Sequence, residues 1–216
     1  MMSEDDLIAH IHLGDRPLAV FDVDDVVLQF IAPFETYLAG QELALLPRSF
    51  RLFGNIVSTA TGEPLSEADV TAAILRFFDE QEVWQTPFTE ATSVLNTLAR
   101  KADIVFLTAM PPLYSAQRRR LLDRFDLPYP LIATESPKGP VVERLHKGRP
   151  LPLVFADDMV RNLQSVAEHA PQSLLLHMLP ESPIHRHAPR APENLARFCD
   201  WQEAARLIDT HFASHP

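Results

Sequence analysis

Apolar and polar positions follow two different patterns along this chain. Pro17 to Phe21 is an apolar run, which predicts a buried strand. From residue 28 to 86 the apolar residues recur at helical spacing, as Val70, Ile74 and Phe77 do, and no strand pattern interrupts them. We therefore expect a small helical insertion directly after the first strand.

After residue 87 the pattern changes to short apolar strands that alternate with helices. Strands are expected at Ile104–Leu107, Leu131–Ala133, Leu153–Ala156 and Ser173–His177, and helices at Thr89–Lys101, Leu113–Phe125, Gly139–His146 and Asn162–His169. Helices between strands that are apolar on both faces are typical of a parallel sheet covered on both sides. The prediction is an α/β fold with a Rossmann-like parallel sheet, in which residues 1–27 and 87–216 form the core and residues 28–86 form a helical cap.

Three further expectations concern single segments. Residues 3–13 have the spacing of a short leading helix, residues 180–192 form a loop, and Glu193 to Phe212 form a closing helix. Within the insertion, Ser66 stands three residues before Asp69 and is a candidate helix cap.

Composition narrows the class of protein. The chain has 216 residues, of which 46% are hydrophobic, so it can bury a core of its own. Its formal net charge of -10 provides no electrostatic footprint for nucleic acid or for an anionic membrane surface. An anionic substrate would need a bound cation or a local positive group.

The expected compartment is the cytoplasm. Cys199 is the single cysteine, which excludes an internal disulfide and fits a reducing environment. The first ten residues are acidic, unlike a signal peptide, and no apolar run is long enough to span a bilayer. No feature of the sequence indicates an oligomeric state.

Acidic residues follow two of the expected strands. Asp22, Asp24 and Asp25 come after the first strand, and Asp157 after the strand at Leu153–Ala156. A buried carboxylate is costly unless a cation or a reaction compensates it. Because ligands of parallel sheets bind beyond the carboxyl ends of the strands, these acids mark the expected site. Asp22 and Asp24 are two residues apart, so in an extended segment their side chains point the same way.

Four short segments together resemble the signature motifs of the haloacid dehalogenase (HAD) superfamily, which consists mostly of phosphohydrolases. They are VFDVDDVV at 20–27, IVFLT at 104–108, the lone Lys138 in SPKGP, and FADDMVRN at 155–162. Each motif alone is weak, but all four occur in the order of the family. The resemblance covers residues 17 to 178, and the ending DWQEAARLI at 200–208 resembles the closing helix of the family.

The resemblance implies a reaction and a metal. Asp22 would be the nucleophile that forms an aspartyl phosphate, and Asp24 the general acid and base. Mg²⁺ would be bound by Asp22, Asp157 and the backbone carbonyl of Asp24. The substrate would be a small phosphomonoester, with the insertion acting as a lid.

The same resemblance assigns the remaining site residues. Thr108, Ala109 and Lys138 would hold the phosphoryl oxygens, because phosphoryl transfer asks mostly for positioning and charge neutralisation. Asp158 and Asn162 would support the site, with Asn162 positioning either Lys138 or the acid pair. A phosphomutase or phosphotransferase of the same superfamily, or a catalytically silent binding member, remain alternatives.

The sequence departs from the family pattern in two places. Asp25 stands where glycine is common, so it either repels the substrate or faces the cap, and Met110-Pro111 follows Thr108 where a small polar residue is commoner. Other noticeable residues have an ordinary structural explanation. The basic run Arg118 to Arg120 is expected on a solvated helix face, and His185 and His187 in a solvated loop. The aromatic residues Phe77, Phe78 and Trp84 are expected in the core of the insertion. Arg48 and Arg51 are candidates to reach a substrate anion.

Overall fold

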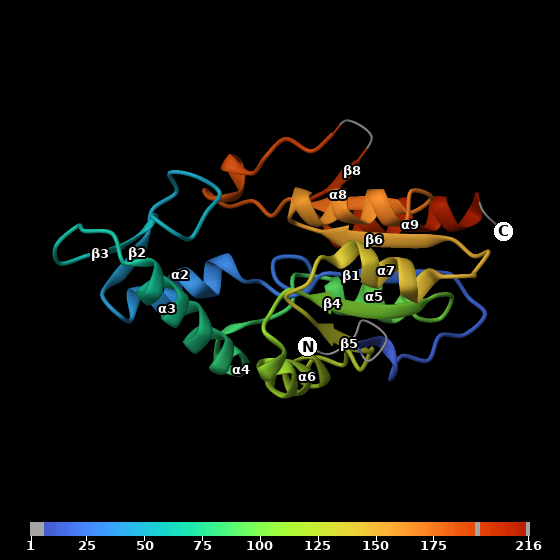
Figure 1. Ribbon diagram of the computed structural model, residues 1–216, viewed down its shortest axis with the longest axis horizontal. Helices are drawn as coiled ribbons and strands as arrows, with labels where there is room; N and C mark the ends of the chain where they lie inside the picture. The colour runs from blue at the N-terminus through green and yellow to red at the C-terminus, as the bar shows by residue number, and fades with distance from the viewer. Residues whose placement is uncertain (1–6, 193–194, 215–216) are drawn as a thin grey trace.

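A six-stranded parallel sheet forms the centre of the molecule in the computed structural model, which describes residues 7–192 and 195–214 (Figure 1). The strands lie in the order β5-β4-β1-β6-β7-β8, and each neighbouring pair is parallel. Their bounds are β1 Leu18–Phe21, β4 Asp103–Thr108, β5 Leu131–Ala133, β6 Leu153–Asp157, β7 Leu174–Met178 and β8 Ala196–Phe198. The predicted α/β fold is confirmed.

Helices cover both faces of this sheet, because residues of β1 alternate between two cores. Ala19 and Phe21 pack in a cluster with α5 (Ala91–Leu98), α6 (Ser115–Arg124) and α9 (Trp201–Ala213). Leu18 and Val20 pack on the opposite face with α7 (Lys138–His146) and α8 (Val160–His169). A strand whose two faces are both buried reads as a continuous apolar run, which is the pattern that Pro17 to Phe21 shows.

The insert, residues 28–86, leaves the sheet after β1 and lies at the left in Figure 1. It contains α2 (Ile31–Ala39), β2 (Leu43–Leu45), β3 (Ile56–Ser58), α3 (Glu67–Asp79) and α4 (Gln81–Trp84). The helices share an aromatic core in which the Phe34 and Phe77 rings lie 5.1 Å apart. As expected, the Ser66 hydroxyl caps α3 by accepting a hydrogen bond from the Asp69 amide at 3.2 Å.

The expectation that no strand interrupts the insert is wrong. β2 and β3 pair as an antiparallel hairpin, with Ala44 opposite Val57. Each strand has only three residues, so neither shows a full period of alternation that the sequence could reveal.

Both chain ends differ from the predicted helices. The leading helix ends at Ile8, and residues 3–6 of the predicted span lie outside the described residues. The closing helix begins only at Trp201, where the Asp200 carboxylate caps it by accepting a bond from the Glu203 amide at 2.7 Å. β8 adds an edge strand before it, and residues 193–194 of the predicted helix lie outside the described part. None of the helices in the described ranges is long and apolar enough to cross a membrane.

Two connections join the insert to the core, and they lie side by side. The Gln29 amide donates to the Thr86 carbonyl at 2.9 Å, and the Phe88 amide donates to the Val27 carbonyl at 3.0 Å. The insert therefore leaves and rejoins the core through one paired hinge, next to the end of β1.

Candidate active site

The predicted site residues converge at the carboxyl edge of the sheet. Asp22 follows β1, Thr108 ends β4 and Asp157 ends β6, which are adjacent strands. Lys138 is the first residue of α7. The structure therefore brings together the residues of all four sequence motifs.

Lys138 joins two of the acids. Its side chain is 2% exposed, and its Nζ donates to Oδ1 of Asp22 and, at 2.7 Å, to Oδ2 of Asp157. Burial alone would lower the pKa of Lys138, but the charges of Asp157 and Asp22 outweigh it and hold the pKa above its ordinary value. Lys138 is therefore a fixed positive charge between the ends of β1 and β6.

Three buried carboxyl groups surround this one ammonium. Asp22, Asp157 and Asp158 offer oxygens that all lie within 4.8 Å of one another. Burial raises the pKa of Asp22 to about 7, although Lys138 partly opposes the shift. Burial, followed by the charge of Asp157, also raises the pKa of Asp158. The cluster thus contains more carboxyl groups than one ammonium can compensate, and it favours bound protons where no further cation is present.

Asn162 acts on the acid pair, one of its two predicted positions. Its Nδ2 donates to both carboxylate oxygens of Asp157 at 3.0 Å. The Met159 amide donates to the same carboxylate at 2.8 Å, and His177 Nε2 donates to the Asp158 carbonyl at 2.9 Å. The Asp157 side chain is therefore held from three directions, counting Lys138.

Asp25 faces the insert, one of the two roles that its position left open. Its φ of 55° lies in the left-handed region, which explains why glycine suits this position. Its carboxylate accepts bonds from the Phe30 amide at 2.8 Å and the Ile31 amide at 3.2 Å, at the start of α2. Burial raises the pKa of Asp25 to about 7, and the two amide bonds only partly oppose it.

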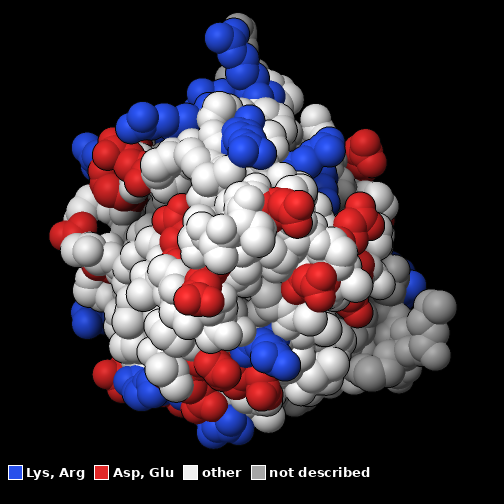
Figure 2. Space-filling model, turned by 90° about the vertical axis from the view of Figure 1, so that its left-hand side faces the viewer, with Lys and Arg blue, Asp and Glu red and all other residues white. Residues whose placement is uncertain are grey.

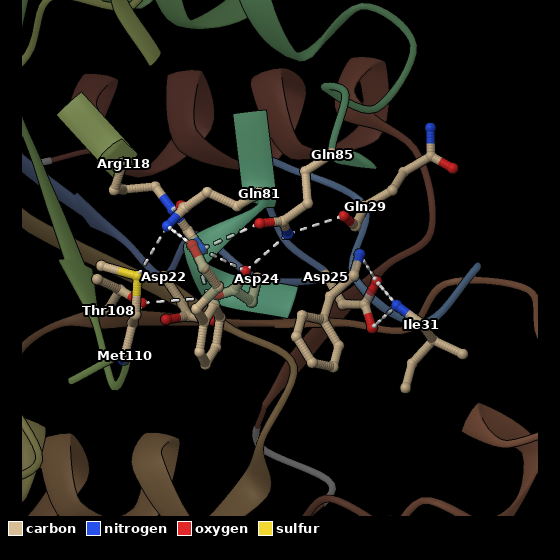
Figure 3. Close-up of polar contacts among 12 residues, drawn as sticks. Asp22, Asp24, Asp25, Gln29, Ile31, Gln81, Gln85, Thr108, Met110 and Arg118 are labelled. Atoms are coloured by element: carbon tan, nitrogen blue, oxygen red, sulfur yellow. Dashed lines mark hydrogen bonds and ion pairs between the residues drawn. The ribbon is translucent and has the colours of Figure 1, made fainter. Parts of the chain in front are cut away.

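Arg118 is buried, so its expected place on a solvated helix face is wrong. Its side chain is 0% exposed, and it reaches Asp24 (Figure 3). Nη2 donates to Oδ1 of Asp24 at 2.9 Å and Nη1 donates to Oδ2 at 3.2 Å. Thr108 Oγ1 donates to Oδ2 as well, at 3.3 Å. The prediction fails because Arg118 lies on the side of α6 that the insert covers, which the local sequence cannot show.

Two glutamines of the insert complete this network. Gln81 Oε1 accepts a bond from Arg118 Nε, and Gln85 Oε1 accepts one from Nη2 at 3.1 Å. Gln85 Nε2 donates to Oδ1 of Asp24 at 2.9 Å and to the Gln29 carbonyl at 3.0 Å. Figure 3 shows these side chains pointing toward one another from the insert and the core.

A cavity of about 680 Å³ lies between the acids and the insert. Its lining includes Asp22, Asp24, Asp158, Asn162 and Ala109 at the sheet edge. The remaining lining residues are Asp25, Phe30, Ile31, Phe50, Arg51, Leu52, Phe53, Glu67, Phe78, Met110, Met159, Arg161, Ile184 and His185. Arg51 thus lines the cavity, whereas Arg48 is not among the lining residues.

His185 lies inside the protein and not in a solvated loop as expected, whereas His187 is exposed. His185 Nδ1 is 2.7 Å from the Ser182 hydroxyl, and Nε2 lies 3.6 Å from Oδ2 of Asp25. Burial lowers the pKa of His185 to about 4, so the ring is neutral at pH 7. Met110, the other departure from the family pattern, is buried in the aromatic core of the insert.

Sequence reasoning missed Arg118, Gln81, Gln85 and His185. The two glutamines carry a weak signal, because they lie four residues apart just before the chain rejoins the core. The sequence contains no signal of a functional role for Arg118 or His185, since neither forms part of a motif.

Comparison with known proteins places the fold. No family model and no curated protein matches this chain. A structure named as a HAD-hydrolase from Bacillus subtilis, bound to magnesium, matches with a TM-score of 0.63 and 15% identity, over 90% of this chain and 99% of that one. A conserved haloacid dehalogenase-like protein from Agrobacterium tumefaciens matches with a TM-score of 0.61 and 17% identity, over 89% and 97% of the two chains. A HAD family hydrolase from Deinococcus radiodurans with bound phosphate and sodium matches with a TM-score of 0.58 and 14% identity, over 88% and 96%. The chain therefore has the fold of the haloacid dehalogenase-like hydrolases.

Proposed function

We propose that this protein is a Mg²⁺-dependent phosphohydrolase that cleaves a small phosphomonoester through an aspartyl phosphate on Asp22. The observation that carries the proposal is the cluster of Asp22, Asp157 and Asp158 around Lys138, open to a cavity that also contains Asp24. Asp22 and Asp24 both face this cavity, which suits a reaction that needs a nucleophile and a proton carrier.

The acidic cluster fits a magnesium ion. Its ligand atoms are carboxyl oxygens, the kind that Mg²⁺ prefers, and its three carboxyl groups outnumber the single ammonium of Lys138. We assign Asp22, Asp157 and the backbone carbonyl of Asp24 as ligands, with Asp158 in support. A bound Mg²⁺ would neutralise charge on the phosphoryl group and on the acids.

In the first step Asp22 acts as the nucleophile. One of its carboxylate oxygens bonds to phosphorus, and the bond from phosphorus to the alcohol oxygen breaks. Asp24 in its acid form gives its proton to that oxygen, so the alcohol leaves neutral. Thr108, Ala109 and Lys138 hold the phosphoryl oxygens, and the charge of Lys138 favours the approach of the anionic substrate.

In the second step Asp24 acts as the base. It takes a proton from water, whose oxygen attacks phosphorus, and the bond from phosphorus to Asp22 breaks. Inorganic phosphate leaves, and both carboxyl groups return to their starting state. Four hydrogen bonds from Arg118, Gln85 and Thr108 hold the Asp24 side chain in place at the cavity.

The insert serves as the lid of this site. Phe30, Phe50 and Phe78 of the insert line the same cavity as Asp22, so the insert shields the reacting atoms from water. Relatives of the same fold support the class of reaction: one structure is named as a predicted phosphoglycolate phosphatase, and another contains phosphate.

Hydrolysis of para-nitrophenyl phosphate tests the proposal. We expect turnover with Mg²⁺, none with EDTA, and an acid-stable phosphoenzyme after a rapid quench. Asp22→Asn should abolish both turnover and phosphoenzyme, whereas Asp126→Asn, which changes an exposed acid in the turn after α6, should leave both intact. Metal-independent turnover, or turnover that survives Asp22→Asn, would refute the proposal.

A further inference from the structure

The carboxylate of Asp24 is held by a buried network that the reaction scheme does not account for. Four donors fill its two oxygens: two from Arg118, one from Gln85 and one from Thr108. The Asp24 side chain itself is 19% exposed and faces the cavity. Three of the four bonds come from Arg118 and Gln85, which do not line the cavity, so Asp24 is oriented mainly by side chains outside the space left for the substrate.

Arg118 has no contact with the cavity, so binding of substrate does not explain its burial. It does not line the cavity, yet Nε, Nη1 and Nη2 each have an acceptor, and its guanidinium lies 5.8 Å from the centre of the Phe78 ring. Burial of an ion pair costs the hydration free energy of both groups, and the attraction between them offsets this cost only narrowly. A buried ion pair is therefore weak evidence of a role in stability. A planar, bidentate guanidinium does fix the rotation of a carboxylate.

We propose that Arg118 is the positioning residue of Asp24. Gln81 and Gln85 hold Arg118 in place, and this couples the Asp24 side chain to the connections between the insert and the core. Gln85 links three parts of this network directly, because it contacts Arg118, Asp24 and the Gln29 carbonyl in the opposite connection. The role of Arg118 rests on the proposed function, in which Asp24 moves protons.

Kinetics of a variant cycle test this role. Arg118→Met should lower kcat by about 10-fold to 100-fold, within the range that general acid-base catalysis contributes, and leave KM unchanged because Arg118 does not line the cavity. Asp24→Asn should lower kcat further, and the double variant should be no slower than Asp24→Asn alone. Arg118→Lys keeps the charge without the bidentate geometry and should recover only part of the loss.

Arg120 provides the matched control. It lies on the same helix and also binds the insert, with Nη2 donating to Oε2 of Glu82 at 2.6 Å, but it does not contact Asp24. Arg120→Met should therefore retain the wild-type kcat. If Arg118→Met does not fold, Gln85→Leu tests the same link and should also lower kcat without additivity to Asp24→Asn.

Two results would overturn the role of Arg118: wild-type kcat in a folded Arg118→Met or Gln85→Leu variant, or losses that multiply in the double variant. A wild-type protein without metal-dependent turnover would instead overturn the proposed function, and the role of Arg118 in it. The two failures are thus distinguished by the activity of the wild-type protein.

The cavity lining carries a second, independent inference about the substrate. The insert contributes six apolar side chains to the lining, beside the charged Arg51 and Glu67; the apolar residues are Phe30, Ile31, Phe50, Leu52, Phe53 and Phe78. Phe53 is 45% exposed and is one of three large hydrophobic side chains left exposed in the described part of the chain. Figure 2 shows this end of the molecule, where separate charged side chains are interspersed with broad uncharged areas.

Few buried polar groups of the lining are free to bind a substrate with many hydroxyl groups. Asp22, Asp24, Asp158 and Asn162 belong to the phosphoryl end, and the Asp25 carboxylate is bound to backbone amides. The other polar lining residues are the exposed Arg51, Glu67 and Arg161 and the buried His185, whose Nε2 has no hydrogen-bond partner among the described residues. His185 can therefore bind one hydroxyl group, whereas a sugar carries several. Each hydroxyl buried without a partner costs about 1–3 kcal/mol.

We infer that the leaving group is an aromatic alcohol and not a polyhydroxylated sugar; this too rests on the proposed function. Phenethyl phosphate and glucose 6-phosphate are both esters of primary alcohols, so their intrinsic reactivity is similar. We expect kcat/KM to be at least about 10-fold higher for phenethyl phosphate, since losing one or two methylene-sized apolar contacts already changes kcat/KM by about that factor.

Substitutions outside the catalytic groups separate the outcomes. Phe53→Ala should lower kcat/KM for phenethyl phosphate severalfold and leave glucose 6-phosphate unaffected, whereas Leu113→Ala, an exposed residue outside the cavity lining, should change neither. Equal or faster hydrolysis of glucose 6-phosphate would overturn the substrate class while leaving the phosphatase intact. Failure to hydrolyse either ester or para-nitrophenyl phosphate would overturn the function itself.

Discussion

Asp25 offers a direct test of how this site is held together. It is an acid buried at the start of α2, and replacement by asparagine keeps its shape, its acceptor for the Phe30 amide and a residue type that tolerates the φ of 55°. The variant differs from the wild type only in that the side chain at position 25 can no longer ionise and has one acceptor oxygen fewer. The new amide group would also face Nε2 of His185, which is buried without a hydrogen-bond partner among the described residues.

The size of the effect follows from the pKa of Asp25. It is about 7 in the folded chain, against 3.8 as the ordinary value, because burial disfavours the charged form. Between these values the folded chain binds more protons than the unfolded chain, so the free energy of unfolding falls as the pH rises. The loss is about 1.4 kcal/mol per pH unit and about 4 kcal/mol in total above pH 7. The Asp25→Asn variant has no titrating group at this position, so its free energy of unfolding does not show this decrease with pH.

We therefore expect the stability of Asp25→Asn relative to the wild type to increase by about 4 kcal/mol between pH 4 and pH 8. Urea unfolding in EDTA, followed by tryptophan fluorescence at each pH, measures the difference. The contributions of the other raised carboxyl groups cancel, except for the small part of the Asp158 shift that is due to the charge of Asp25. Asp126→Asn is the matched control, since Asp126 has a φ of 57° but is exposed, and its difference should not change with pH. A pH-independent difference for Asp25→Asn would refute the reasoning.

Three further predictions concern packing and charge. Gly139→Ala should lower stability by about 1–3 kcal/mol in thermal unfolding, because a Cβ there would run into the Ser165 carbonyl of the adjacent helix. Gly40→Ala, which meets only ordinary contacts, should not, and equal melting temperatures for the two would contradict the close approach of α7 and α8. Mg²⁺ should raise the melting temperature more at pH 8 than at pH 5, because the metal must displace the proton of Asp22, whose pKa is about 7; a shift that is the same at both pH values would argue against this site. Lys138→Met should lower stability in EDTA by about 3–5 kcal/mol, since it leaves two buried carboxylates without their cation, and Mg²⁺ should recover part of that loss. An unchanged unfolding midpoint for this variant would contradict the view that the Lys138 ammonium compensates the buried carboxylates.

The sequence alone determined which edge of the sheet carries the clustered acids. Runs that are apolar on both faces predicted β1, β4 and β6, because a parallel strand buried on two sides has no polar positions to alternate with. Because β1 and β6 are parallel strands of one sheet, the acids that directly follow them lie at the same edge, where the strands end. The same logic failed for β2, β3 and β8, because three residues are too few to show a full period of alternation, although β5 is equally short and was predicted.

Only the tertiary structure decided the surroundings of the acids. Arg118 is buried because the insert covers it, His185 because a loop brings it against Asp25, and both look like ordinary surface residues in the sequence. Local sequence predicts the periodicity of an element, but the burial of a side chain depends on which other element packs over it. The sequence therefore singled out Asp22, Asp24 and Asp157 as candidates, whereas the fold showed which side chains hold Asp24 and that Asp25 binds the start of α2.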